Sequence, residues 1–335
     1  MHYTPRFVID ALLSSIANLP PRKIIEAEVA LATARRRAEA VVEIDAAAAK
    51  GVCPRCASSE RSSWGTTRTG ARRWRCRTCQ KTWSGRTGSP VAHIHRPGLF
   101  IELMRNMLDP NETPLSCRKM AHRLGLSKDT VWRWRMVILE HLASVPPEVM
   151  TGIVETDETY QRESRKGSRE WVRKAANPND PSIPTPPRRR WKDYGRKGPP
   201  QAIVRQWLRP ILGVVDRTGA ASFQLIADTK QPTIDAALAP QVAGDAMMLF
   251  DGAPQYEAIA RARGLSYKVL IAGRRSRTTP KAFHLNSVNG LHAEWKSDFR
   301  TPFRGPATKY LAGYARWMVA RRKGDAVEAF RAILA

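Results

Sequence analysis

A predicted helix near the end of the chain carries polar side chains at a regular spacing. The helix runs from His284 to Phe299, and its Asn289 and Lys296 lie seven residues apart. This is about two helical turns, so both project from nearly the same face, with His292 close to that line. Val288, Leu291, Trp295 and Phe299 provide apolar side chains that can pack. The polar stripe indicates polar or anionic partners elsewhere in the chain, or else a solvated helix face.

Two aspartates earlier in the chain are candidate partners of this stripe. Asp157 follows an apolar run that begins at Ile153, and Asp251 follows the run from Ala246 to Phe250. Mg²⁺ prefers carboxylate and other oxygen ligands, together with water and substrate phosphate. We therefore expect Asp157, Asp251 and Asn289 to close around divalent metal and a DNA phosphate. The alternative for each aspartate taken alone is a structural acid at the end of a strand.

Several other acids lie near these positions in the sequence. Glu155 and Glu158 flank Asp157, and we expect both to point to the other face of the strand. Asp216 precedes Arg-Thr-Gly, which is typical of an ordinary hairpin turn. Asp298 lies off the line of the polar stripe, where an ion pair with a nearby Lys or Arg is expected.

Four of the five cysteines form two tight pairs. These are Cys53-Pro-Arg-Cys56 and Cys76-Arg-Thr-Cys79, and nineteen residues separate them. Two such pairs place four thiolates at the corners of a tetrahedron, about 2.3 Å from one Zn²⁺. With four sulfur ligands the zinc would be structural, and its binding would contribute most of the folding free energy of so small a unit. The alternative is a redox pair of CxxC motifs. Cys117 fits a small packed residue better than a nucleophile.

The stretch around the cysteine pairs predicts a basic zinc ribbon. Its glycines and tryptophans suit two short strands joined by a turn, and Glu60 is the one acid between residues 51 and 90. Arg72 and Arg73 are the leading candidates for contact with DNA. The whole chain of 335 residues has 56 Lys and Arg against 30 Asp and Glu, a net charge of +26, which favours a polyanionic partner. No apolar run is long enough to span a membrane, so we expect DNA and no membrane.

Residues 113–142 match the pattern of a helix-turn-helix. The first helix begins near Thr113 and ends at Leu124, Gly125 makes the turn, and a second helix follows the N-cap Ser127. In the major groove of DNA, the second helix would use Lys128, Thr130, Arg133 and Arg135, with Ser127 beside them. Its Val131, Trp134 and Ile138 would pack inward. A structural helical hairpin is the alternative.

Two long segments carry less information. Residues 1–50 are predicted to be helical, with an apolar run from Phe7 to Leu13. Residues 161–210 hold fourteen Lys and Arg, four acids and eight prolines, so little of this segment can bury a core. It is either a basic insertion that follows a DNA backbone, with Arg188, Arg189 and Arg190 as contacts, or a solvated linker.

From residue 150 the order of predicted elements indicates an α/β domain. Strands are expected over 153–157, 211–217 and 222–228, followed by a helix over 233–242, a strand over 246–250, a helix over 254–263, a strand over 267–271 and the helix described first. Further helices are expected from about Thr308 to Arg322 and at the C-terminus. The acids then lie at the tips of adjacent strands and on a closing helix.

This order resembles the ribonuclease-H-like core of DDE transposases and retroviral integrases. More narrowly, the chain is similar to insertion-sequence transposases that carry an N-terminal zinc ribbon and a helix-turn-helix. The segments that carry the resemblance are Val154-Glu-Thr-Asp157-Glu-Thr-Tyr160, Leu249-Phe-Asp251-Gly252, His284-x-Asn286-x-x-Asn289 with Lys296, and Phe303-Arg-Gly305-x-Ala307-x-Lys309-Tyr-Leu311-x-x-Tyr314. The resemblance covers nearly the whole chain from residue 51.

The resemblance implies a metal-dependent phosphoryl transfer. Two Mg²⁺ (or Mn²⁺) ions, about 3.5–4 Å apart, would stabilise the attacking and leaving oxygens of a phosphodiester. Asp157 would bridge both ions, Asp251 would hold one and Asn289 the other, and Lys296 would contact the phosphate or terminal bases. Asn289 departs from the Glu that is commonest at this position, although some members of the group have Asn there with a Lys seven residues later. His292 is expected to be packed or solvated, rather than to orient water or DNA.

The sequence thus predicts a multidomain DNA transposase of an insertion sequence. We expect a helical region over 1–50, a zinc ribbon over 51–90, a helix-turn-helix domain over 98–147 and a ribonuclease-H-like core over 150–335, with a mixed five-stranded sheet flanked by helices. It would bind terminal inverted repeats as a dimer or larger homo-oligomer, on the nucleoid in a bacterial cytoplasm. The alternatives are an inactive transposase-derived DNA-binding regulator, for which Asn289 is the best argument, and a metal-dependent nuclease without strand transfer.

Overall fold

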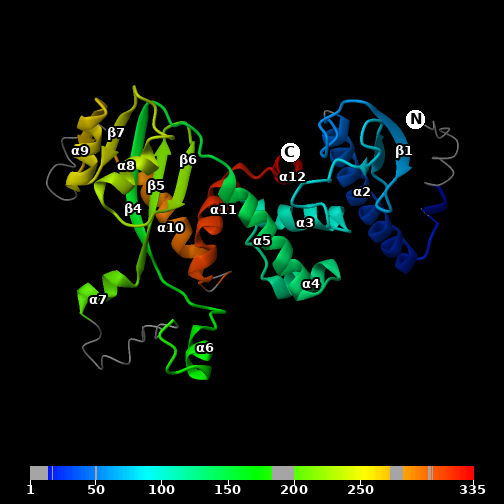
Figure 1. Cartoon of the computed structure of the whole chain (residues 1–335), viewed down its shortest axis with the longest axis horizontal. Helices are drawn as coiled ribbons and strands as arrows, with labels where there is room; N and C mark the ends of the chain where they lie inside the picture. Colours follow the sequence, from blue (N-terminus) through cyan, green and yellow to red (C-terminus); the bar gives the residue numbers. More distant parts are fainter. Residues whose placement is uncertain are drawn as a thin grey trace. The chain divides into compact units, whose positions relative to one another are not determined.

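The chain divides into two compact units in a computed structural model (Figure 1). One unit comprises residues 1–138 and 324–335, and the other comprises residues 139–323. The structure describes residues 14–16, 18–49, 51–182, 200–271, 282–300, 303 and 305–335. The predicted apolar run from Phe7 to Leu13 lies outside these residues. Within the described part of the chain, no helix combines the length and apolar character needed to cross a membrane.

Three helices form the core of the first unit: α2 (Pro21–Ala49), α3 (Pro97–Leu108) and α12 (Ala326–Leu334). They pack on one another, although α12 comes from the other end of the chain. Phe100 of α3 lies against Phe330 of α12, with ring centroids 6.2 Å apart. Arg331 pairs with Glu43 of α2 at 2.6 Å. The predicted helical N-terminal region is therefore confirmed over α2, which has a structural partner rather than standing alone.

A small antiparallel sheet follows α2 in the chain. Its strands are β1 (Arg61–Thr66), β2 (Arg72–Cys76) and β3 (Thr82–Trp83), in the order β1-β2-β3. The sequence predicted the first two strands, and the third adds a two-residue edge beside the second pair of cysteines. Arg61 donates to the carbonyls of Ala48 (at the end of α2) and Gly51, so the sheet is tied to the end of the helix. This sheet brings the four paired cysteines together.

Two helices with the predicted turn come next, α4 (Cys117–Leu124) and α5 (Lys128–Ser144). The side chain of Ser116 accepts the N–H of Lys119 and caps the first helix. Gly125 ends it in the left-handed conformation, with φ of 61°, which a glycine adopts without strain. Ser127 accepts the N–H of Thr130 at the start of the second helix. The predicted boundaries of both helices are therefore confirmed to within a few residues.

The second unit is built on a mixed five-stranded sheet of order β6-β5-β4-β7-β8. The strands are β4 (Ile153–Arg162), β5 (Leu208–Asp216), β6 (Ala221–Leu225), β7 (Met247–Phe250) and β8 (Ser266–Val269). The first three pair antiparallel, whereas β7 joins β4 in parallel and β8 joins β7 in parallel. The predicted mixed sheet with flanking helices is confirmed. The central strand is β4, so its side chains are enclosed by neighbours on both sides.

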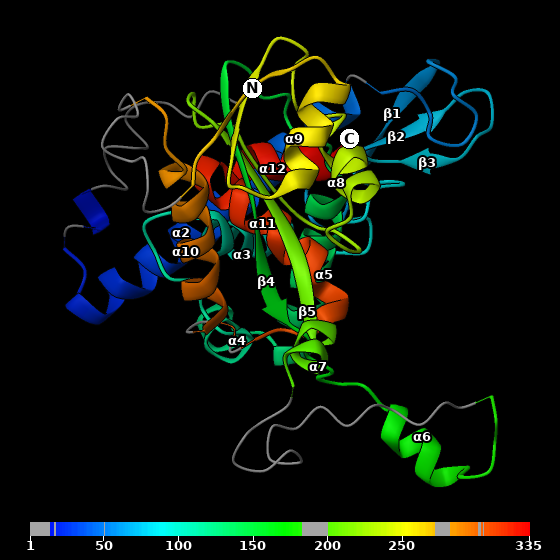
Figure 2. The same ribbon diagram turned by 90° about the vertical axis from the view of Figure 1, so that its left-hand side faces the viewer.

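Alternation along β4 assigns one set of side chains to each face of the sheet. Val154 faces the apolar cluster formed with α8 (Gln231–Leu238) and α9 (Pro254–Ala262). Glu155 and Asp157 face α10 (Asn286–Arg300), which packs on β4 and β5. The element α11 (Leu311–Lys323), which follows the short helix η2 (Thr308–Tyr310), packs on β6. In Figure 2 the pair α8 and α9 lies toward the viewer, with β4 and β5 behind it.

The basic segment contributes more order than its composition predicts. Strands β4 and β5 extend into it, with Arg162 paired to Leu208 at the far end of the ladder. It also contains α6 (Glu170–Ala176) and α7 (Gln201–Gln206), which lie beyond that end of the sheet in Figure 2. Residues 183–199, which include Arg188, Arg189 and Arg190, lie outside the described residues. Both ends of the segment are therefore part of the α/β unit.

Gly213 of β5 allows α10 to approach the sheet closely. A Cβ atom at this position would lie 3.0 Å from Cγ2 of Val288 and 3.1 Å from Nε2 of His292, and both of those side chains are buried. We expect Gly213→Val to overpack this contact and to lower the free energy of unfolding by about 1–3 kcal/mol. Urea unfolding followed by circular dichroism measures the change.

Gly290, on α10 itself, provides the matched control. A Cβ at this glycine has nothing within 4 Å, so Gly290→Ala should leave stability unchanged or raise it by up to about 1 kcal/mol. Equal effects of the two substitutions would contradict the assigned contact between α10 and β5.

Candidate functional site

Asp157 lies within β4, and Asp251 directly follows the neighbouring parallel strand β7. Val154 pairs with Met248 and Glu155 with Leu249, and Asp157 and Asp251 each come two residues after this last pair. The negative charge of Asp251 also acts on the carboxyl group of Asp157. The structure therefore brings together two of the predicted site residues, which lie far apart in the sequence.

Helix α10 contacts Asp157 through His292. Asp157 pairs in the ladder with Gly213, where the missing side chain leaves room for the imidazole. Nδ1 of His292 lies 3.7 Å from Oδ2 of Asp157. Burial lowers the pKa of His292 to about 4, helped by the ammonium of Lys296 and opposed by a hydrogen bond to the backbone of Asp157. His292 is therefore a neutral, packed side chain at neutral pH, as expected.

Asp157 holds its proton more tightly than an ordinary aspartic acid. Burial raises its pKa to about 6, against the lowering effect of the backbone N–H of Glu158. The carboxylates of Asp251 and Glu158 raise it further, and the charge of Lys296 lowers it. The site thus collects more negative than positive charge. Such a cluster of oxygen donors has the chemistry of a hard divalent cation site.

The polar stripe of α10 is only partly tied to the acids. Lys296 and Asn289 are both exposed and lie on one helical face, and the charge of Lys296 acts on Asp157. None of the contacts recorded among the described residues joins the amide of Asn289 to either aspartate. The side-chain oxygen of Asp251 accepts the N–H of Ala253, just before α9. The structure thus brings Lys296 near Asp157, with Asn289 exposed on the same face of α10.

The prediction for Glu155 is wrong. Glu155 is two residues from Asp157, so alternation places both on the face that α10 covers. Glu158 does lie on the other face, beside Tyr256 of α9, and burial raises its pKa. The carboxylate of Asp216 accepts the N–H groups of Thr218 and Ala220, as expected for a hairpin turn. Asp298 pairs with Arg321 at 3.0 Å, which confirms the expected ion pair.

Sequence reasoning missed two residues that contact Glu155. Arg217 forms an ion pair with its carboxylate, and His284 lies 3.1 Å from the same oxygen. Arg217 follows β5 and His284 precedes α10. Both lie in loops, where no helical or strand periodicity marks a residue. The available signal was the position of Glu155 itself, since an acid in a central strand requires buried partners.

The four paired cysteines form a compact cluster in the first unit. Their sulfur atoms all lie within 4.8 Å of one another, and this is the one such group of His, Cys, Asp or Glu ligands in the described residues. Sγ of Cys53 lies 3.6 Å from Sγ of Cys79, and Sγ of Cys56 lies 3.5 Å from Sγ of Cys76. A tetrahedron of ligands about 2.3 Å from zinc has edges of about 3.8 Å. The sulfur positions therefore fit one tetrahedral metal ion.

Both cysteine pairs adopt the same local turn. The N–H of Ala57 donates to the carbonyl of Cys53 at 2.9 Å, and the N–H of Gln80 donates to that of Cys76 at 3.1 Å. Ala57 and Gln80 have φ angles of 57° and 59°, the positive values among the described non-glycine residues. A hydrogen bond from the backbone of Cys79 lowers the pKa of Cys76 to about 6. The repeated geometry and this thiolate suit metal ligation.

Candidate DNA contacts in the first unit divide into exposed and buried residues. Lys128 and Arg133 are exposed on α5, and Thr130 is partly exposed. Arg135 is buried and donates to the carbonyl of Leu115, which removes it from the candidate contacts. The prediction that Arg135 contacts the major groove is therefore wrong, because its place on α5 turns it toward the segment before α4. In the small sheet, Arg72 and Arg73 are exposed. Arg72 also lies over the ring of Trp74.

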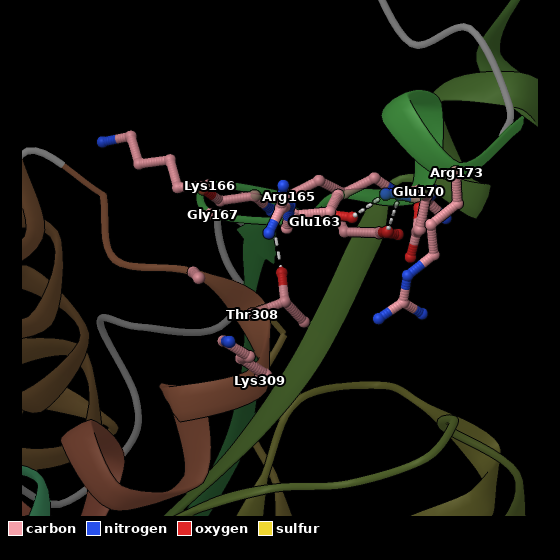
Figure 3. Close-up of a pocket in the computed structure, with 12 residues that line it drawn as sticks. Glu163, Arg165, Lys166, Gly167, Glu170, Arg173, Thr308 and Lys309 are labelled. Carbon is pink, nitrogen blue, oxygen red and sulfur yellow. Dashed lines mark hydrogen bonds and ion pairs between the residues drawn. The ribbon is translucent and has the colours of Figure 1, made fainter. Parts of the chain in front are cut away.

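A basic pocket of about 450 Å³ lies at the far end of β4 in the second unit (Figure 3). Glu163 pairs with Arg165 at 2.9 Å and with Arg209 at 2.6 Å. The N–H of Ser164 donates to Oγ1 of Thr308, which joins this loop to the segment before α11. The remaining cationic side chains that line the pocket are Lys166, Arg169, Arg173 and Lys309. The pocket therefore carries a surplus of positive charge.

Comparison with known proteins identifies no family or function for this chain. No protein-family model matches this chain, and no curated protein matches it. Functional interpretation therefore depends on the two sites described above. These are the cysteine cluster of the first unit and the paired aspartates of the second.

Loss of one cysteine ligand should release the metal ion. We expect the wild-type protein to contain one zinc per chain, and Cys76→Ser to contain none and to unfold at a lower temperature, because zinc binding contributes to folding. Elemental analysis and thermal unfolding measure the two effects. Cys117→Ser is the matched control and should keep its zinc, since Cys117 lies outside the cluster. Zinc retained by Cys76→Ser would contradict the four-cysteine site.

The raised pKa of Asp157 predicts a pH-dependent effect on stability. Because the folded protein binds this proton more tightly than the unfolded chain, the charged carboxylate destabilises the fold as pH rises through about 6. Asp157→Asn should therefore be more stable than wild type at pH 7.5, with a difference that shrinks as pH falls toward 4. Urea unfolding without added divalent metal measures it.

Asp228 provides a control of opposite sign. A hydrogen bond with the side chain of Thr233 lowers the pKa of Asp228, helped by the backbone N–H of Lys230. Asp228→Asn should thus be less stable than wild type at pH 7.5, and the difference should shrink below about pH 4. Parallel pH profiles for the two variants would rule out the environment assigned to Asp157.

Proposed function

We propose that this protein is a DNA transposase of an insertion sequence with a ribonuclease-H-like catalytic core. The observation that carries the proposal is the proximity of Asp157, in β4, to Asp251, which follows the parallel strand β7, with His292 of α10 against Asp157. The order of three antiparallel strands followed by two parallel strands also fits the core expected from the sequence. The cysteine cluster and the exposed basic residues of α5 support a DNA-binding first unit, with a zinc ribbon and a helix-turn-helix.

The residues of the second unit fit binding of divalent metal. Asp157 and Asp251 would hold Mg²⁺ through carboxylate oxygens, and Asn289 would supply a neutral amide oxygen. When bound, the metal stabilises charge on the attacking and leaving oxygens of the phosphodiester. Lys296 lies on the exposed stripe of α10, where its ammonium attracts a DNA phosphate. The neutral His292 fills the space between α10 and β5, so water is excluded from the inner side of Asp157.

The basic surfaces are the proposed contacts with the DNA backbone. In the first unit these are Arg72, Arg73, Lys128 and Arg133. In the second unit the pocket between the end of β4 and Thr308 carries Lys166, Arg173 and Lys309 (Figure 3). Contacts of this kind neutralise phosphates and carry little sequence information. They support binding of DNA by both units, with the reaction assigned to the second.

A non-catalytic DNA-binding regulator is the second candidate. The observation in its favour is Asn289, whose neutral amide ligates metal more weakly than a carboxylate and has no recorded contact with the aspartates. A nuclease without strand transfer would use the same acids. These functions differ in their products, because the regulator cuts no DNA and the nuclease cuts without joining the cut ends to a target.

The proposal predicts cleavage that depends on Asp157. The protein is incubated with Mg²⁺, a supercoiled plasmid and a duplex containing the DNA that flanks its own coding sequence. We expect nicks at the 3′ ends of the flanking DNA and joined products in the plasmid. Asp157→Asn should lower the rate by at least about 10²-fold, or about 2.7 kcal/mol of barrier, through loss of a metal ligand. Gel electrophoresis measures both products.

Asp228→Asn is the matched control, since Asp228 also follows a strand but lies away from the aspartate pair. It should cleave at the wild-type rate. Binding without cleavage by the wild-type protein would support the regulator instead, and cleavage without joined products would support the nuclease.

A further inference from the structure

Glu155 is a fully buried carboxylate two residues before Asp157. Its exposed fraction is 0 %, and it projects from the central strand toward α10. A charge removed from water in this way is costly unless other groups pair with it. Asp157 lies on the same face of the same strand, so any group that binds Glu155 is fixed at a set distance from the proposed metal ligand.

The partners of Glu155 come from the start of α10 and from the β5–β6 turn. Its Oε2 accepts the backbone N–H of Val288 at 2.9 Å. Val288 lies in the first turn of α10, where N–H groups have no acceptor within the helix and the helix dipole favours an anion. Its Oε1 forms an ion pair with Arg217 and lies 3.1 Å from Nδ1 of His284. One carboxylate thus joins three separate parts of the unit.

Arg217 extends the attachment to the residues that precede and begin α10. Its guanidinium donates to Oγ of Ser287 at 3.1 Å and to the carbonyl of Ala282 at 2.9 Å. It also donates to the carbonyl of His284 at 3.3 Å. The start of α10 is therefore held to the sheet by charged hydrogen bonds, which are stronger than neutral ones. Farther along, α10 packs through apolar side chains such as Leu291 and Trp295, and Asp298 pairs with Arg321 near its other end.

This attachment controls where the polar stripe of α10 lies. One helical turn after Val288, His292 reaches Asp157, and Lys296 follows one turn later. A rotation or shift of the helix at Val288 would move the whole stripe, because a helix is a rigid rod over two turns. We propose that Glu155, with Arg217 and His284, is a positioning residue that fixes α10 over Asp157. The proposal rests on the proposed function of the second unit.

Glu155→Gln tests the proposal with little change of shape. Glutamine has one carbonyl oxygen and no charge, so it cannot serve both Val288 and Arg217 as an acceptor. We expect hydrogen exchange at the amides of residues 288–292 to become at least about tenfold faster. We also expect the rate of DNA cleavage to fall by about 10–100-fold with unchanged affinity for DNA, since small misplacements of catalytic groups have large effects on rate.

Asp298→Asn is the matched control on the same helix. Asp298 is a half-buried acid that pairs with Arg321 near the other end of α10. Its substitution should leave exchange at residues 288–292 and the cleavage rate unchanged, even where it lowers the unfolding temperature as much as Glu155→Gln does. If Glu155→Gln does not fold, Arg217→Lys keeps the charge, removes the forked guanidinium and should show the same two effects, smaller in size.

The two readouts separate the two proposals. A wild-type protein that cleaves no DNA would overturn the proposed function, whereas hydrogen exchange would still test the attachment of α10. Unchanged exchange in both Glu155→Gln and Arg217→Lys would overturn the attachment. Faster exchange with an unchanged cleavage rate would overturn the positioning role and leave Glu155 a purely structural residue.

Discussion

The central constraint on the second unit is the burial of acidic side chains in its middle strand. β4 pairs on both sides, yet it presents Glu155, Asp157 and Glu158. Each acid has a different environment. Glu155 is enclosed by Arg217, His284 and a helix N-terminus, whereas burial raises the pKa of Asp157 and of Glu158. A strand that served packing alone would carry apolar residues here, because uncompensated acids lower stability. The two acids with raised pKa are therefore the feature of this unit that most favours a functional interpretation.

In the first unit, the small sheet β1-β2-β3 has few apolar residues to stabilise it. The apolar cluster at this sheet consists of Ala48, Trp83 and cysteine side chains, with Trp74 beside them. The four sulfur atoms are close enough for one metal ion, and Arg61 and Asp45 bind the sheet to the end of α2. The stability of the sheet thus depends on a metal-binding cluster and a neighbouring helix together. Contact with α2 buries surface that a sheet of three short strands cannot bury by itself.

Sequence patterns predicted the features that depend on local spacing. The cysteine pairs, the turn at Gly125 and the end of β7 before Asp251 all follow from residue type and period. The length of β4 was not predicted, since its last residues lie in a segment whose composition resembles a linker, and only pairing with β5 orders them. Asp157, expected at a strand end, therefore lies in the middle of β4 (Ile153–Arg162). The left-handed turns at Ala57 and Gln80 were also hidden, because neither residue type favours that conformation. Glu155 differs from these cases. Residues two apart on a strand share a face, so the position of Asp157 was sufficient to place Glu155 on the face toward α10. The prediction placed Glu155 on the opposite face.

The charge balance around Asp157 gives a physical reason for an amide at position 289. Asp251 and Glu158 already raise the pKa of Asp157, and Lys296 lowers it. A carboxylate on the same stripe as Lys296 would add a further negative charge facing these acids. It would strengthen metal binding, but it would also raise the cost of the metal-free fold and compete for Lys296. Asparagine offers an oxygen without that repulsion. In the proposed site, the weaker ligand is therefore balanced by a lysine that remains free to attract phosphate.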